Sequence, residues 1–143
     1  MNLNSGAGAV VAVFLWLEIK HFIFDYVLQT PFQFRNKGTY GHPGGALHSG
    51  MQALATIPAF FILPPGWLMG VTIIIGEFIV HYHVDWSKEQ SLRRMKLTTT
   101  DAGYWRIYGI DQLAHHLTYV VIAALLAGVI QYPLTGRPLP LWS

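Results

Sequence analysis

The sequence contains no cysteine, so it offers neither disulfide bonds nor thiolate ligands for a metal. Charged residues make up only 11% of its 143 residues, whereas soluble domains carry about 25%. The net charge of +2 is too small to indicate a polyanionic partner, and we expect no nucleic-acid binding. Hydrophobic residues, in contrast, account for 52% of the chain and aromatic residues for 14%. This composition excludes disorder and an ordinary water-soluble enzyme, and it predicts one integral membrane domain over residues 1–143.

Four apolar segments cover most of the chain, at about residues 7–29, 46–63, 67–87 and 107–132. A helix needs about 20 apolar residues to cross a bilayer, and the Pro-Pro-Gly sequence at 64–66 separates the second segment from the third. We therefore predict an all-α bundle of four transmembrane helices. The motif H-x3-D followed by an aromatic residue occurs at His21 and again at His81, which favours two hairpins related by an approximate two-fold axis.

Basic residues are distributed unevenly between the loops. Seven of the eight that lie outside the apolar segments fall in the first and third loops, and the eighth is Arg137. The seven are Arg35, Lys37, Lys88, Arg93, Arg94, Lys96 and Arg106. The positive-inside rule then predicts that these two loops are cytoplasmic and that both termini lie outside.

Ionisable residues recur at helical spacing inside the apolar segments, where each costs a few kcal/mol and so requires a partner or a role. One stripe contains Glu18, His21, Asp25 and Gln29, and another contains Glu77, His81, Asp85 and Lys88. The remaining segments contribute His48, Asp111 and His115. In the predicted topology the histidines and aspartates lie near the cytoplasmic ends of their helices, so we expect them to form one site.

Imidazole and carboxylate groups are the ligands of zinc, and also of manganese and non-haem iron. The sequence therefore predicts a divalent metal site, with zinc as the first choice. Its expected ligands are His21, Asp25, His48, His81, Asp85, Asp111 and His115. Glu18 and Glu77 are the candidate catalytic groups, and Gln29, Lys37, Lys88 and Gln112 are expected to bind substrate. His42, His83 and His116 lie off the stripes and are not expected to be ligands.

Three functions remain open for such a polar core. The first is a metal-dependent hydrolase that acts on a lipid-like or phosphorylated substrate at the cytoplasmic leaflet. The second is proton, ion or small-solute transport through the same residues. The third is a non-catalytic scaffold, in which the polar groups hold the helices together. The lipid bilayer is the expected partner in each case, and an oligomer is compatible with all three.

The combined motifs H-x3-D-x2-L-Q at His21, H-x3-D-x2-K at His81 and D-Q-x2-H at Asp111 resemble a family of small bacterial and phage inner-membrane proteins. That family is classed as a domain of unknown function. The resemblance covers nearly the whole chain. It implies a helical protein of the bacterial inner membrane and implies no particular activity.

Overall fold

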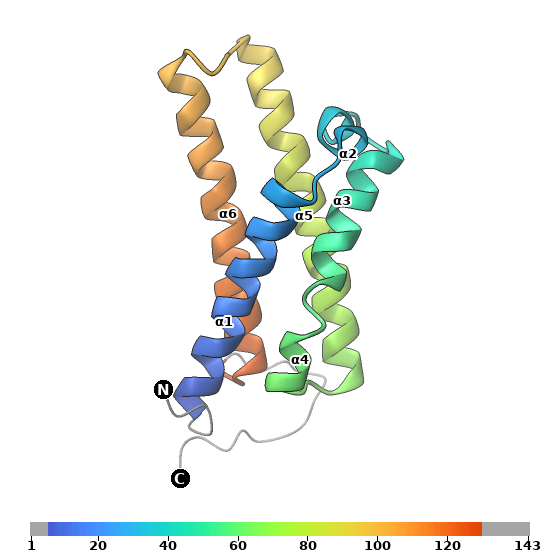
Figure 1. Cartoon of the computed structure of the whole chain (residues 1–143), viewed down its shortest axis with the longest axis vertical. Helices are drawn as coiled ribbons and strands as arrows, with labels where there is room; N and C mark the ends of the chain where they lie inside the picture. Colours follow the sequence, from blue (N-terminus) through green and yellow to red (C-terminus); the bar gives the residue numbers. More distant parts are fainter. Residues whose placement is uncertain (1–5, 130–143) are drawn as a thin grey trace.

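Six α-helices and one π-helix form the part of the chain that the computed structural model describes, residues 6–129 (Figure 1). Helix α1 (Gly6–Phe22) continues into a π-helix, η1 (Ile23–Val27). Helices α2 (Pro31–Asn36), α3 (Pro43–Leu54) and α4 (Ala59–Ile62) follow, and then the long helices α5 (Trp67–Met95) and α6 (Ala102–Leu126). The described residues contain no strand, which confirms the all-helical prediction for this part of the chain.

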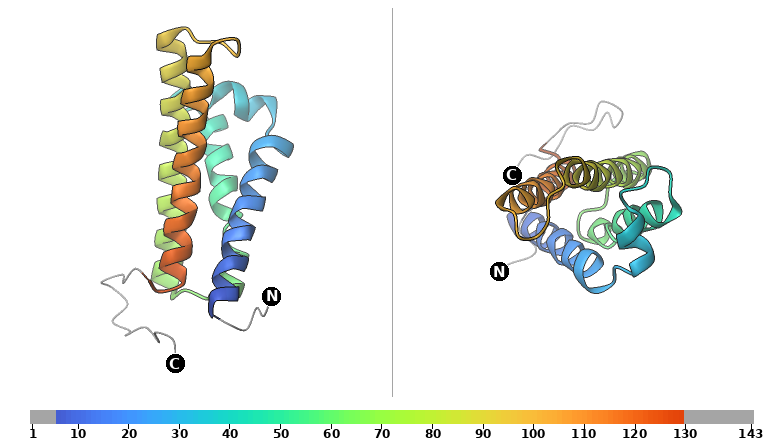
Figure 2. Two further views of the ribbon diagram at one scale, coloured as in Figure 1. Left: turned by 90° about the vertical axis from the view of Figure 1, so that its left-hand side faces the viewer. Right: turned by 90° about the horizontal axis from the view of Figure 1, so that it is seen from above.

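Helices α5 and α6 form an antiparallel hairpin, against which the other helices pack. Helix α1 contacts α6, and α3 contacts α5, so that the view along the bundle shows the helices arranged in a ring (Figure 2). The start of α1 and the end of α6 lie at one end of the bundle, and the loop between α5 and α6 lies at the other (Figure 1). The basic residues at 35–37 and 93–96 therefore lie toward that second end.

Three helical segments are long and apolar enough to cross a membrane: Gly6–Val27, Trp67–Met95 and Ala102–Leu126. Large apolar side chains at four-residue intervals, such as Leu15 with Ile19 and Leu113 with Leu117, are exposed on their outer faces. Charged side chains are buried between them. This reversed distribution of polarity is typical of a membrane protein, because lipid solvates apolar side chains and does not solvate charges.

The boundaries of these helices differ from the predicted ones. The third predicted segment ends at residue 87, whereas α5 continues to Met95. The fourth predicted segment starts at 107 and ends at 132, whereas α6 covers Ala102–Leu126. Residues 130–132 of that segment, and Arg137, lie outside the described residues. The predicted segments ended where the apolar residues end. The helices themselves continue through polar residues whose side chains contact neighbouring helices.

The second predicted segment, 46–63, is not one continuous helix. Helix α3 ends at Leu54, and hydrogen bonds between residues three apart carry the chain through 55–58 into α4. Pro58 has no N–H to donate and cannot continue the regular ladder. Two carbonyl oxygens freed at the break accept side-chain donors from α1: Ala55 accepts from Trp16 Nε1 (2.9 Å) and Gln52 from Lys20 Nζ (2.8 Å). Neighbouring side chains thus satisfy the backbone where the helix is broken.

An apolar core fills one half of the bundle and a polar core fills the other. Val13 and Leu17 of α1, Ile73 of α5 and Ile122 of α6 pack around α4 near the end where α1 begins. Beyond them, toward the basic end, the buried side chains are mostly histidines, carboxylates and lysines. The apolar half holds the helices together, and the polar half contains the candidate site.

Candidate functional site: a buried histidine and aspartate cluster

A wide helical turn places Asp25 at the centre of the bundle. The backbone changes from α to π geometry at Ile23, and Leu28 N–H donates to the Ile23 carbonyl five residues earlier (2.8 Å). Such turns occur often at functional sites, because they rotate the side chains that follow relative to an α-helix. The helical span predicted for residues 7–29 therefore continues to Val27 but changes from α to π geometry after Phe22. His21 and Asp25 still point to the same side, with Nε2 and Oδ2 3.7 Å apart.

Four ligand atoms from three parts of the chain converge on one point. The Nε2 atom of His48 on α3 lies 3.1 Å from Asp25 Oδ1, 3.2 Å from Asp85 Oδ2 and 3.1 Å from His81 Nε2. His81 Nε2 lies 3.5 Å from Asp85 Oδ2 and 3.9 Å from Asp25 Oδ1. All four side chains are at least nine-tenths buried. We refer to these four residues as the central cluster.

These separations fit the geometry of a bound metal. A tetrahedral site with metal–ligand distances of about 2.0–2.2 Å has its ligand atoms about 3.3–3.6 Å apart, and the five distances above span 3.1–3.9 Å. The ligand atoms of Asp25, His48 and His81 all lie within 4.8 Å of one another. Among the described residues, Asp85 Oδ2 has no hydrogen-bond donor although two imidazole nitrogens lie beside it. A proton or a cation between these atoms would stabilise the buried carboxylate oxygen. The residues present therefore fit a divalent ion.

The other oxygen of Asp85 faces a second set of groups. Lys37 Nζ lies 3.1 Å and Lys88 Nζ 3.2 Å from Asp85 Oδ1. Lys88 also contacts Asp111 Oδ2 at 3.3 Å. His115 Nε2 lies 3.9 Å from Asp85 Oδ1 and 3.7 Å from Asp111 Oδ1. Asp85 thus connects the central cluster to two lysines, Asp111 and His115. The His115 ring centre lies 4.1 Å from that of His81, and His81, Asp85 and His115 form a second group whose ligand atoms all lie within 4.8 Å of one another.

Polar side chains around the central cluster fix the orientation of its members. Gln29 Nε2 lies 3.1 Å from His48 Nδ1, and Gln52 Nε2 donates to Asp25 Oδ1 at 2.6 Å. His21 does not join the four ligand atoms. Its Nδ1 lies 2.9 Å from the Tyr119 hydroxyl, and its Nε2 lies 3.1 Å from Gln112 Oε1. His21 is therefore placed to orient Asp25 and is not one of the four converging residues, in the way that outer groups orient metal ligands.

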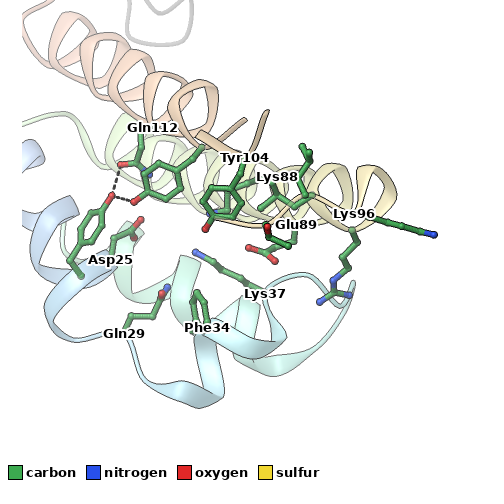
Figure 3. A pocket seen from close by; sticks show the side chains of 15 residues that line it. Asp25, Gln29, Phe34, Lys37, Lys88, Glu89, Lys96, Tyr104 and Gln112 are labelled. Atoms are coloured by element: carbon green, nitrogen blue, oxygen red, sulfur yellow. Dashed lines mark hydrogen bonds between the residues drawn. The ribbon is translucent and has the colours of Figure 1, made fainter. Parts of the chain in front are cut away.

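The cluster borders a pocket of about 570 Å³ between α2 and the basic end of the α5–α6 hairpin (Figure 3). Asp25, Gln29, Lys37, Lys88 and Gln112 line its inner part. All four predicted substrate-binding residues therefore reach this pocket. Aromatic side chains and further basic residues line the rest: Tyr26, Phe34, Tyr104, Tyr108, Arg93 and Lys96. A molecule in this pocket would reach Asp25 of the central cluster.

Glu18 and Glu77, the two predicted catalytic carboxylates, lie outside the central cluster. Glu77 is 2% exposed and forms an ion pair with Lys20 of α1, and Thr56 also donates to it. Glu18 points away from the cluster and contacts His116 Nδ1 at 2.7 Å on the half-exposed outer face of α1 and α6. Glu18 shares a helical stripe with His21 in sequence, but its pairing with His116 directs it away from the site.

Lys20 is the main polar residue that the sequence analysis missed. It is completely buried, and its ammonium group lies 4.7 Å from the centre of the Tyr119 ring. The signal was present, because a lysine inside an apolar segment is itself unusual and requires a partner. Of the histidines that were set aside, His42 caps α3 by accepting from Gly44 N–H (3.0 Å), and His83 contacts the Tyr40 hydroxyl outside the bundle.

Comparison with known families places this chain in one of them. A family model described as "Protein of unknown function (DUF3307)" matches residues 13–135. The chain belongs to the DUF3307 family. The matched region contains the central cluster, the pocket and the buried Lys20–Glu77 pair. No curated protein and no solved structure matches the DUF3307 chain.

Proposed function

We propose that this DUF3307 protein is a membrane-embedded, metal-dependent hydrolase. The observation that supports this most strongly is the convergence of His48 Nε2, His81 Nε2, Asp25 Oδ1 and Asp85 Oδ2 at separations suited to a tetrahedral ion. Zinc is the favoured ion for this donor set, and manganese or iron are alternatives. Such an ion supplies a nucleophilic water at neutral pH. The adjoining pocket admits a substrate to Asp25.

We further propose that the protein crosses a bacterial inner membrane four times. Helices α3 and α4 together form the second of these crossings along the chain. Twelve residues of α3 extend about 18 Å, which is less than the roughly 30 Å of a bilayer core. Helix α4 continues the crossing in the same column of the bundle (Figure 1). The basic loops would face the cytoplasm and both termini the outer side, as the charge distribution favours.

Metal analysis of the detergent-purified full chain tests the proposal. The expected result is close to one zinc per chain, with the amount reduced at least tenfold in His48→Ala and His81→Ala. His83→Ala is the matched control, because His83 lies on the same helix as His81 but outside the cluster. Metal that is absent from the wild-type protein, or that is retained equally in all three variants, would refute the hydrolase.

A second candidate function, ion or proton transport, is supported by one feature. The buried Lys20–Glu77 pair lies beside the break between α3 and α4, and broken helices with buried charges occur at the ion sites of transporters. Liposomes that contain the protein would distinguish the two functions. Proton flux that persists after chelation of metal and is abolished in Glu77→Gln would favour transport.

A further inference from the structure

The pocket beside the central cluster contains an excess of basic groups. Asp25, Lys37 and Lys88 line its inner end, and Asp85 and Asp111 lie behind the two lysines as their ion-pair partners. With neutral histidines and a divalent ion, these groups sum to a charge of +1. At the mouth, Arg93 and Lys96 outnumber Glu89, which adds one further positive charge. The metal-loaded pocket therefore favours an occupant with about two negative charges.

Lys37 is placed to bind that occupant directly. Its side chain is 5% exposed, it lines the pocket, and among the described residues its ammonium group donates to one acceptor, Asp85 Oδ1. An ammonium group has three donors, so two remain for a ligand. Lys37 follows α2, whose start is fixed by a capping box between Thr30 and Gln33. The cap of α2 and its packing on α3 hold the backbone of Lys37 in place.

The outer part of the pocket is apolar and aromatic. Tyr26, Phe34, Tyr104 and Tyr108 line it together with Leu92. The hydroxyl groups of Tyr26 and Tyr108 are hydrogen-bonded to each other, and Tyr26 also donates to Gln112 Oε1 at 3.2 Å (Figure 3). Their rings are left to contact apolar groups. Tyr26 and Phe34 are more than half exposed, at a depth where the apolar helix faces give way to basic residues.

We infer that the pocket binds a lipid that carries a phosphate monoester, with the phosphate between Lys37, Lys88 and the metal site and the chains along the aromatic wall. A phosphate monoester carries nearly two negative charges at neutral pH and offers several acceptor oxygens. The inference rests on the proposed function, because it names the substrate class of the same site. In the corresponding reaction the oxygen of water bonds to phosphorus and the P–O bond to the lipid alcohol breaks. The alcohol leaves with a proton from that water, and inorganic phosphate is released.

Binding measurements on the zinc-loaded full chain in detergent micelles test the inference. The probes are phosphatidic acid, diacylglycerol, which has the same chains without phosphate, and glycerol 3-phosphate, which has the phosphate without chains. We expect phosphatidic acid to bind at least tenfold more tightly than either of the others. Equal binding of diacylglycerol would refute the phosphate subsite, and equal binding of glycerol 3-phosphate would refute a lipid ligand.

Variants of Lys37 test whether the phosphate group binds in this pocket. Lys37→Gln should weaken phosphatidic acid binding about 10-fold or more, the effect of one lost charged hydrogen bond, and should leave diacylglycerol binding and zinc content unchanged. Lys37→Arg should restore most of the affinity. Arg94→Gln is the control, because Arg94 is exposed and does not line the pocket. Phosphatidic acid binding that is insensitive to Lys37 in a zinc-containing protein would overturn the inference.

The two proposals can fail separately. Lys37-dependent binding of phosphatidic acid without release of inorganic phosphate would refute the hydrolase and support the lipid-phosphate site. Release of product from a different ester, with no Lys37 dependence, would support the hydrolase and refute the lipid-phosphate site.

Discussion

The buried pair of Lys20 and Glu77 should contribute more to stability than any exposed ion pair in the protein. Lys20 donates to Glu77 and to the Gln52 carbonyl, and Glu77 also accepts from Thr56. Removal of one partner leaves a buried charge without compensation, at a cost of about 3–5 kcal/mol. For a chain of this size, this corresponds to a fall in Tm of roughly 6–20 °C. We therefore expect Lys20→Met and Glu77→Gln each to unfold at a much lower temperature than the wild type.

A double-mutant cycle gives the sharper test. When Lys20→Met and Glu77→Gln are combined no buried charge remains, and the cost falls to about 1–3 kcal/mol for the polar atoms that lose a partner. The two single changes should therefore sum to at least about 3 kcal/mol more than the double change. Thermal unfolding in detergent, followed by circular dichroism, measures all three. Glu18→Gln is the control, because its pair with His116 is partly exposed and should contribute less than about 1 kcal/mol. Single changes below about 1 kcal/mol that add to the double change would refute the reasoning.

Three further predictions concern positions around the site and the hairpin loop. Tyr119→Phe removes the buried hydroxyl that contacts His21 Nδ1 and should lower the free energy of unfolding by about 1–2 kcal/mol without loss of bound zinc. A large loss of zinc would contradict this. Gly44→Ala places a Cβ atom 2.4 Å from the Phe32 carbonyl oxygen, whereas in Gly50→Ala the nearest atom is 3.9 Å away. The first change should therefore lower Tm by at least about 2 °C and the second should not, and equal Tm values would contradict the packing of α2 on α3. At the exposed loop, the backbone N–H of Thr98 and then its hydroxyl hold the pKa of Asp101 below its usual range. This contact therefore stabilises the loop above about pH 4 and is lost as pH falls through the lowered pKa. Hydrogen-exchange protection factors at the start of α6 should fall in acid, and Asp101→Asn should abolish that change.

The sequence predicted the long helices and the shared polar site for a clear physical reason. Charged residues inside apolar segments are so costly that they must meet one another, and four-residue spacing places them on one face. His81 with Asp85, and Asp111 with His115, meet that condition on regular helices. Their relative positions therefore followed from helix geometry and needed no knowledge of the tertiary structure.

What the sequence did not predict depends on contacts between helices. The π turn at Ile23–Val27 has no local signature, and Glu18 seemed equivalent to His21 until the structure paired it with His116. Pro58 interrupts the backbone ladder locally, but the length of the break depends on donors from Trp16 and Lys20, which lie far away in sequence. The ranking among the seven expected ligands also required coordinates, because only the three-dimensional arrangement distinguishes the four converging atoms from those that surround them.

The π turn also makes the register of the first helix unusually important. A helix advances by about 100° per residue, so loss of one residue from the Ile23–Val27 turn would rotate the preceding part of α1 against everything that follows. Asp25 could then face His48 and His81 only if His21 and Lys20 left their partners. A substitution in this stretch keeps the rotation of α1 relative to the rest of the bundle. An insertion or deletion of one residue changes that rotation.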